Sequence, residues 1–169
     1  YSKSVSSIVD WKCPDCGDII LNKSINTVYG RGLNCTACSD KVSFPEKIMF
    51  SLLKFMEVKF HSQKTFTWSN RKKYDFYLPD YNMIIETHGI QHFEQSNRGR
   101  TLKEEQDNDS YKEKRAKENG IENYIVIDCR YSDFEFIKEN ILNSKISDIF
   151  NLRYIKWNDI NELSQKSTN

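Results

Sequence analysis

The sequence predicts an α/β (α+β) protein in which a mixed sheet flanked by helices follows a small module that contains most of the cysteines. Two short apolar runs, at residues 74–78 and 83–87, are separated by the turn-forming Pro-Asp-Tyr-Asn and predict a β-hairpin. Helical patterns on both sides of the hairpin, and another apolar strand downstream, extend this pattern to a whole domain. The expected division is a cysteine module at 1–42, a core domain at 43–152, and a partly helical or frayed C-terminal segment at 153–169.

The composition is that of a globular protein, since 38% of the 169 residues are hydrophobic and 13% are aromatic. The 25 basic and 24 acidic side chains nearly cancel, so the net charge alone does not indicate a nucleic-acid-binding protein. No apolar run approaches the ~20 residues of a membrane span, and the N-terminus lacks the pattern of a signal peptide. We therefore expect a soluble intracellular protein without a membrane partner. Because the chain begins with Tyr1 rather than Met, we also expect a fragment or a processed form.

Two Cys-x-x-Cys pairs lie in the first module, with eighteen residues between them. Pairs at such a spacing close a tetrahedral cage of four thiolates around Zn²⁺, because each tight turn supplies two sulfurs. One alternative is disulfides or unrelated buried thiols, which the lack of a secretory signal disfavours; another is a larger metal or redox assembly that includes the histidines. The module is too short for a hydrophobic core, so zinc would supply much of its folding free energy. The predicted zinc ligands are Cys13, Cys16, Cys35 and Cys38.

A helix is predicted to begin after Ser43. Ser43 and Glu46 have the spacing of a capping box, and Pro45 lies in the first turn, where its missing N–H costs nothing. Apolar side chains then recur at steps of three and four residues, which predicts a stripe that faces the core. The stripe comprises Ile48, Met49, Leu52, Leu53, Phe55, Met56 and Phe60. As a capping residue, Glu46 needs no catalytic role.

The segment from Lys54 to Lys73 is basic, and aromatic side chains are interleaved with its cations. Cations neutralise phosphates and aromatic rings stack on bases, so this composition is typical of a nucleic-acid surface. The alternative is a solvated strand edge, on which lysines prevent aggregation. Beyond the hairpin, Gly99 lies between two further arginines in a predicted loop. The candidate nucleic-acid contacts are Lys64, Trp68, Arg71, Lys72, Lys73, Arg98 and Arg100.

The hairpin carries two acids and is followed closely by histidines. Because side chains alternate between the faces of a strand, Glu86 and His88 share a face with Ile84, opposite the strand that carries Asp75. Carboxylates and an imidazole on one face predict a pocket for a divalent metal ion and a proton acceptor. Taken singly, each residue also fits a structural role, such as a turn acid or a hydrogen-bonded histidine.

Three further elements are predicted after the hairpin. They are a charged helix at 102–119, an apolar strand at 124–128 and an amphipathic helix at 133–150. Gly120 is a natural left-handed stop for the first of these helices. Asp109 and Lys112 lie three residues apart on one side of the same helix. Cys129, at the end of the strand, is expected to be a core thiol.

In this order the elements resemble the core of the PD-(D/E)xK nuclease superfamily. The closer resemblance is to its branch of very short patch repair mismatch endonucleases and phage homing endonucleases with an E-D-x-H-D motif. Residues 74–93, YDFYLPDYNMIIETHGIQHF, are similar to the D-F-x-L-P, apolar strand, T-H-G and later histidine of that branch. Residues 107–121, DNDSYKEKRAKENGI, resemble its D-x-x-K helix, and residues 43–53 its opening S-x-x-E helix. The resemblance covers roughly residues 43–130; His88 replaces the lysine of the E-x-K triplet, and His92 comes one residue earlier than in the repair enzymes.

The resemblance implies a restriction-endonuclease-like domain preceded by a zinc-ribbon or treble-clef-like module. The implied activity is Mg²⁺-dependent hydrolysis of phosphodiesters in double-stranded DNA, by nicking or by double-strand cleavage, in a homing-type or repair-like role. The implied setting is a bacterial or phage-infected cytoplasm, with monomer and homodimer both open. The alternative is a non-catalytic, zinc-containing nucleic-acid-binding protein that retains the nuclease fold.

The resemblance also assigns roles to residues. Asp75 would bind Mg²⁺ together with the carbonyl oxygen of Thr87 or the carboxylate of Glu86. His92 is favoured as the proton acceptor, with His88 orienting or stabilising the phosphate, and the choice between the two histidines stays open. The implied catalytic residues are Glu46, Asp75, Glu86, His88, His92, Asp109 and Lys112, of which Glu46 and Asp109 would bind metal-linked water or position a base.

Overall fold

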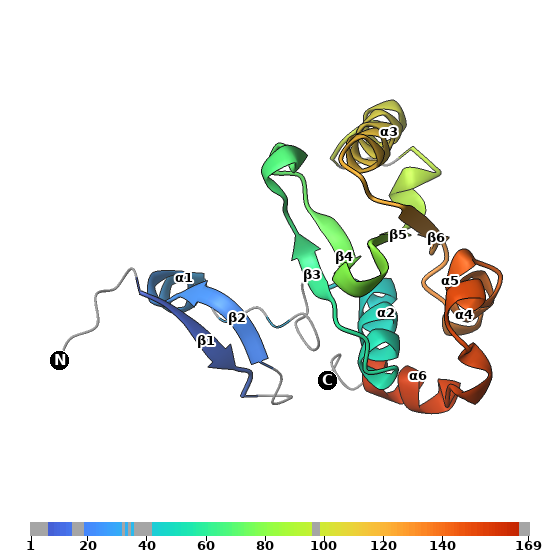
Figure 1. Cartoon of the computed structure of the whole chain (residues 1–169), viewed down its shortest axis with the longest axis horizontal. Coiled ribbons are helices and arrows are strands. Elements are labelled where there is room, and N and C mark those ends of the chain that lie inside the picture. Colours follow the sequence, from blue (N-terminus) through green and yellow to red (C-terminus); the bar gives the residue numbers. More distant parts are fainter. Residues whose placement is uncertain are drawn as a thin grey trace.

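The computed structural model describes residues 7–14, 19–31, 33, 35, 42–95 and 99–165, and its fold is mixed α+β, as predicted (Figure 1). The described residues form a two-stranded sheet near the N-terminus and a four-stranded sheet in the core domain. Among the described helices, none combines the length and the apolar composition needed to cross a membrane.

The N-terminal module contains an antiparallel hairpin of β1 (Ile8–Lys12) and β2 (Ile19–Ser24), followed by α1 (Ile25–Arg31). Cys13 and Cys35 are each 2% exposed and form a small cluster with the buried Ile20. The other two predicted zinc ligands, Cys16 and Cys38, lie outside the described residues. The two described cysteines therefore have the burial of structural ligands or core thiols, while the predicted cage as a whole is not described.

The four-stranded sheet has the order β3-β4-β5-β6. Its strands are β3 (His61–Lys64), β4 (Tyr74–Leu78), β5 (Met83–His88) and β6 (Asn123–Asp128). The first three strands are antiparallel neighbours, whereas β5 and β6 are parallel, with His88 opposite Asp128. Parallel strands end at the same edge of a sheet, so the chain that follows His88 and the chain that follows Asp128 leave the sheet side by side.

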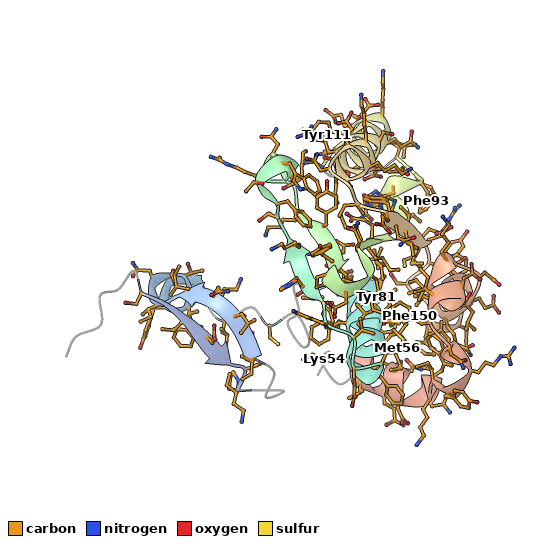
Figure 2. All side chains as sticks on the ribbon, in the orientation of Figure 1. Lys54, Met56, Tyr81, Phe93, Tyr111 and Phe150 are labelled. Carbon is orange, nitrogen blue, oxygen red and sulfur yellow. The ribbon has the colours of Figure 1, made fainter. Side chains whose placement is uncertain are left out.

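The hairpin of β4 and β5 is the one predicted from the sequence. Its turn is a 3₁₀ segment at Pro79–Tyr81, closed by Asn82 in a left-handed conformation (φ 43°), which asparagine tolerates well. The Asn82 side-chain amide donates a 2.6 Å hydrogen bond to the carbonyl oxygen of Gly120. Tyr81 lies against Phe150, with ring centroids 4.7 Å apart (Figure 2). The turn is thus held by contacts from two distant segments.

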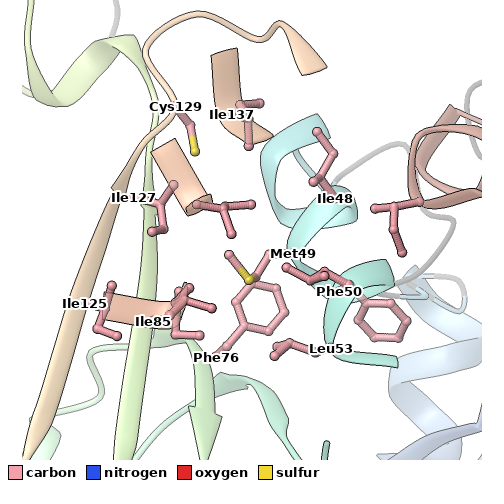
Figure 3. Packing of buried hydrophobic residues seen from close by; sticks show 14 of the residues in the cluster. Ile48, Met49, Phe50, Leu53, Phe76, Ile85, Ile125, Ile127, Cys129 and Ile137 are labelled. Atoms are coloured by element: carbon pink, nitrogen blue, oxygen red, sulfur yellow. The ribbon is translucent and has the colours of Figure 1, made fainter. Parts of the chain in front are cut away.

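One face of the sheet carries the main hydrophobic core. Helix α2 (Phe44–Phe55) begins with the predicted capping box between Ser43 and Glu46, and its side chains Ile48, Met49 and Leu53 lie against Phe76 of β4 (Figure 3). Helix α4 (Phe134–Leu142), helix α5 (Lys145–Ile149) and helix α6 (Trp157–Gln165) contribute to the same core. Because α2 is anchored in this core, Glu46 in its first turn has a fixed position.

Helix α3 (Leu102–Glu118) covers the other face, apart from the other core helices (Figure 1). Its Thr101 and Glu104 form a second capping box, and its Ala116 packs with Ile84 of β5. Since Ile84, Glu86 and His88 share one face of β5, as predicted, α3 lies directly over the two polar side chains.

Three segments differ from the sequence expectations. Helix α2 ends at Phe55, so Phe60 of the expected stripe lies beyond the helix, and Phe55 itself is exposed. The amphipathic pattern at 133–150 is divided into α4 and α5, because Ser144 leaves the first helix and caps the second through the backbone N–H of Ile146. The C-terminal α6 packs against α2, and Ile160 is fully buried in the main core. The core domain therefore extends beyond residue 152.

Candidate active site

A pocket of about 310 Å³ opens where α2, the ends of β4 and β5, and α3 meet. All seven residues with a predicted catalytic role line it, together with the predicted metal-binding Thr87. They are Glu46, Asp75, Glu86, Thr87, His88, His92, Asp109 and Lys112. These side chains come from segments up to 66 residues apart, from Glu46 to Lys112, so the fold assembles what the sequence leaves dispersed.

Asp75 is held from the neighbouring strand. Both the backbone N–H and the hydroxyl of Thr87 donate to Asp75 Oδ2, at 2.8 and 2.9 Å, which fixes the orientation of the carboxylate. Its other oxygen, Oδ1, lies 3.4 Å from Nε2 of Gln63, and the same nitrogen donates to Glu46 Oε1 at 2.8 Å. Two carboxylate oxygens from different elements thus converge on one positively polarised group.

Glu46 caps α2 and also lines the pocket. Its Oε2 accepts hydrogen bonds from the backbone N–H and the hydroxyl of Ser43, so it caps α2. Its Oε1 reaches the pocket and accepts from Gln63. Capping and participation in the site therefore do not exclude one another.

Glu86 is paired with Lys112. The side chain of Glu86 is 3% exposed, and its Oε1 lies 2.7 Å from Lys112 Nζ. Burial raises the pKa of Glu86, the nearby charge of Asp75 acts in the same direction, and Lys112 opposes both. Tyr124 donates a longer hydrogen bond, 3.4 Å, to the same oxygen. This pairing leaves Glu86 less available as a metal ligand than Asp75.

His88 and His92 lie beside each other, with ring centroids 4.0 Å apart and planes inclined by 12°. Nδ1 of His92 lies 2.6 Å from Asp109 Oδ2, whereas Nδ1 of His88 is 3.7 Å from the same oxygen. Burial favours a raised pKa for Asp109, but the hydrogen bond to His92 and the nearby imidazoles outweigh it and lower this pKa. Ligand atoms of His88, His92 and Asp109 lie within 4.8 Å of one another, a grouping that can also hold a metal ion.

The environment of His88 depresses its basicity. Burial lowers the pKa of His88 to about 4, the neighbouring His92 acts in the same direction, and Asp109 and Asp75 oppose the shift. In the metal-free protein we therefore expect the His88 ring to stay neutral through pH 6 and to titrate near pH 4 in an NMR titration. A His88→Gln variant assigns the signal. Titration of that signal near pH 6.5, the value of a free histidine, would contradict the described environment.

This shift also sets the sign of a stability effect. Between about pH 6.5 and pH 4 the unfolded chain binds a proton at His88 that the folded chain excludes. The free energy of unfolding should therefore fall as the pH drops through this window, and less so in His88→Gln.

The predicted nucleic-acid contacts have mixed environments. Trp68 stacks on Phe66, with ring centroids 4.4 Å apart, and packs against the buried residues between α3 and the sheet. Part of its ring surface is therefore already covered. Lys72 Nζ donates to Asn108 Oδ1 at 2.6 Å, and Arg100 forms a 3.6 Å ion pair with Glu105. The exposed candidates are Arg71, Lys73 and Arg100, Lys64 is partly exposed, and Arg98 lies outside the described residues.

Gln63 and Arg130 are polar residues at the site that were not anticipated. Gln63 has a left-handed backbone (φ 50°) in β3 and bridges Glu46 and Asp75; its place opposite Asp75 follows only from the pairing of β3 with β4. Arg130 lines the pocket, and it comes two residues after the end of β6. The parallel pairing of β5 and β6, which no local pattern specifies, brings it to the pocket that the histidines line.

Comparisons of the chain with protein-family models, with curated proteins and with solved structures find no match in any of the three.

Proposed function

We propose that the protein is a metal-dependent DNA endonuclease whose core domain has a restriction-endonuclease-like fold. The observation that carries this proposal is that α2, the β4–β5 hairpin, the segment after β5 and α3 bring the seven residues implied by the resemblance into one pocket. Phosphodiester hydrolysis requires a cation near the phosphate, a proton acceptor for the attacking water and positive charge for the developing oxyanion. The pocket contains oriented carboxylates, a carboxylate-bound histidine and a lysine, one candidate for each requirement.

The donor set fits Mg²⁺. Hard oxygen ligands suit this ion, and Asp75 Oδ1 and Glu46 Oε1 already converge on the amide of Gln63, which would yield its place to a cation. Asp75 is the proposed direct ligand and Glu46 a partner through water, with the carbonyl oxygen of Thr87 completing the protein ligands. When bound, Mg²⁺ would offset the charge that builds on the phosphate oxygens.

His92 is the proposed proton acceptor. Its Nδ1 faces Asp109 Oδ2, so the neutral ring donates from Nδ1 and presents Nε2 as the acceptor. As water attacks phosphorus and the bond to the leaving oxygen breaks, Nε2 takes the water proton and Asp109 stabilises the imidazolium. His88, which is stacked on His92 and has a pKa lowered by burial, is proposed to orient the phosphate.

A matched pair of histidine variants tests this assignment. We expect His92→Ala to slow Mg²⁺-dependent nicking of supercoiled plasmid by about 10²-fold or more, the usual contribution of a general base. His61→Ala should cut at the wild-type rate, because His61 is exposed on β3 and does not line the pocket. Equal rates for the two variants would remove His92 from the mechanism. Loss of activity in His88→Ala with retention in His92→Ala would transfer the role to His88.

We further propose that the N-terminal module holds a structural zinc ion through Cys13, Cys16, Cys35 and Cys38. The burial of Cys13 and Cys35 in one small cluster supports this proposal. Elemental analysis of the purified protein should find about one zinc per chain, a content unchanged by His88→Ala and His92→Ala. Cys13→Ser should lose the zinc, whereas Cys129→Ser should retain it, since Cys129 is buried in the main core. Redox-labile cysteine pairs without zinc would overturn the assignment.

Double-stranded DNA is the proposed substrate. A second, more open groove of about 490 Å³ adjoins the site, shares Asn108 with it, and is lined by Lys72, Arg100 and Tyr111 as well as by acids. Cations and an aromatic ring beside the pocket suit a polyanion that enters it.

A further inference from the structure

We propose that Arg130 binds a non-bridging oxygen of the scissile phosphate, held in position for this task by Asp128. This inference rests on the proposed nuclease function and adds to it a residue that neither the sequence motifs nor the resemblance assigns.

The Asp128 carboxylate binds one edge of the Arg130 guanidinium. Nε of Arg130 lies 3.1 and 2.9 Å from the two oxygens of Asp128, and Nη2 lies 2.8 Å from Oδ2. The backbone N–H of Arg130 also donates to Asp128 Oδ1, at 3.0 Å. A planar guanidinium bound along one edge has a fixed orientation.

Phe93 fixes the same group from a second direction. The guanidinium carbon lies 3.9 Å from the centroid of the Phe93 ring, a cation–π contact, and Phe93 lies close below α3 (Figure 2). Asp128 and Phe93 come from the two parallel-strand ends that the fold places side by side. Within the part of the chain that the structure describes, Nη1 has no hydrogen-bond or ion-pair partner.

The placement distinguishes this pair from an ordinary surface ion pair. Arg130 lines the pocket, together with Asp75 and His92, whereas Asp128 does not line it. The carboxylate therefore holds the cation without occupying the substrate space. A pocket of about 310 Å³ is at the small end for ligand sites, so a phosphate bound there is within reach of several of its walls. Arg130 then supplies N–H donors to oxygens that gain charge as the phosphorus is attacked.

The test is steady-state cleavage of supercoiled plasmid in Mg²⁺ by four variants that remain folded in a thermal melt. Arg130→Ala should lower kcat by about 10²-fold with a smaller change in KM, because the contact strengthens in the transition state. Arg130→Lys should recover only part of the loss, since a lysine lacks the planar fork. Asp128→Asn should produce a smaller loss than Arg130→Ala, as expected for a positioning residue. Arg153→Ala, which removes one exposed positive charge outside the pocket, should match the wild type.

The results distinguish a failure of the proposed nuclease function from a failure of the proposed role of Arg130. A wild-type protein that cuts no DNA defeats the proposed function and this inference together. A wild-type protein that cuts, with Arg130→Ala retaining kcat within about twofold or behaving like Arg153→Ala, overturns this inference alone. If Arg130→Ala does not fold, Arg130→Lys decides in its place, and wild-type kcat in that variant counts against the proposal.

Discussion

Asp75→Asn is expected to reduce Mg²⁺-dependent plasmid cleavage by about 10²- to 10³-fold while leaving the fold intact. Asparagine has the same shape and can still accept the hydrogen bonds that Thr87 donates, so the hairpin should keep its geometry. The amide is uncharged and binds a hard cation poorly, so several kcal/mol of transition-state stabilisation should be lost. Initial rates of nicking, together with urea unfolding midpoints, measure both parts of this expectation.

Asp80→Asn is the matched control. Asp80 is an exposed acid in the turn of the same hairpin and does not line the pocket. It undergoes the same chemical change at a short distance along the chain, and we expect wild-type cleavage. If Asp75→Asn and Asp80→Asn cut equally fast, Asp75 is not a metal ligand.

Lys112→Met is expected to cost about 3–5 kcal/mol of unfolding free energy at pH 7, the range measured when one partner of a buried ion pair is removed. The variant leaves the Glu86 carboxylate buried without the cation that lies 2.7 Å from it in the wild type. In the variant, Glu86 can lose this unpaired charge by taking up a proton, because burial already raises its pKa. The folded variant then binds more protons than the unfolded chain, so its stability should fall as the pH rises.

Urea unfolding of Lys112→Met at pH 5 and pH 7 measures this effect, with the larger loss expected at pH 7. Adding Glu86→Gln to Lys112→Met should restore much of the stability, since it removes the unpaired charge. Lys114→Met is the control, because Lys114 is 74% exposed and its ion pair with Glu118 lies on the surface. Equal free energies of unfolding for Lys112→Met and Lys114→Met would show that the buried pair of Lys112 and Glu86 adds no more stability than a surface ion pair.

Local chemistry predicts the parts of the fold that depend on neighbours in sequence. The hairpin follows from apolar runs around a turn of Pro79 and Asn82, and the start of α2 follows from the spacing of Ser43 and Glu46. The grouping of Glu86 and His88 on one face follows from strand alternation. Each of these features requires no knowledge of what lies far away along the chain.

The remaining features depend on pairings that no local pattern specifies. The parallel pairing of β5 with β6 places Arg130 at the pocket, and the pairing of β3 with β4 places Gln63 between two carboxylates. The packing of α6 on α2 depends on Ile160 meeting a core that is built from several other elements. The break at Ser144 arises because its side chain caps α5 and does not continue α4, and an amphipathic pattern does not predict where such a cap forms.

Cleavage of supercoiled plasmid by the wild-type protein tests whether the pocket hydrolyses DNA. With Mg²⁺ present, nicked or linear DNA should accumulate with time, and EDTA should abolish the reaction. Purified in the same way, the Asp75→Asn and His92→Ala variants should lose cleavage, whereas the Asp80→Asn and His61→Ala variants should keep it. A folded, zinc-containing wild-type protein that binds duplex DNA but never cuts it, with Mg²⁺ or Mn²⁺, would exclude the proposed nuclease activity and favour a non-catalytic nucleic-acid-binding protein.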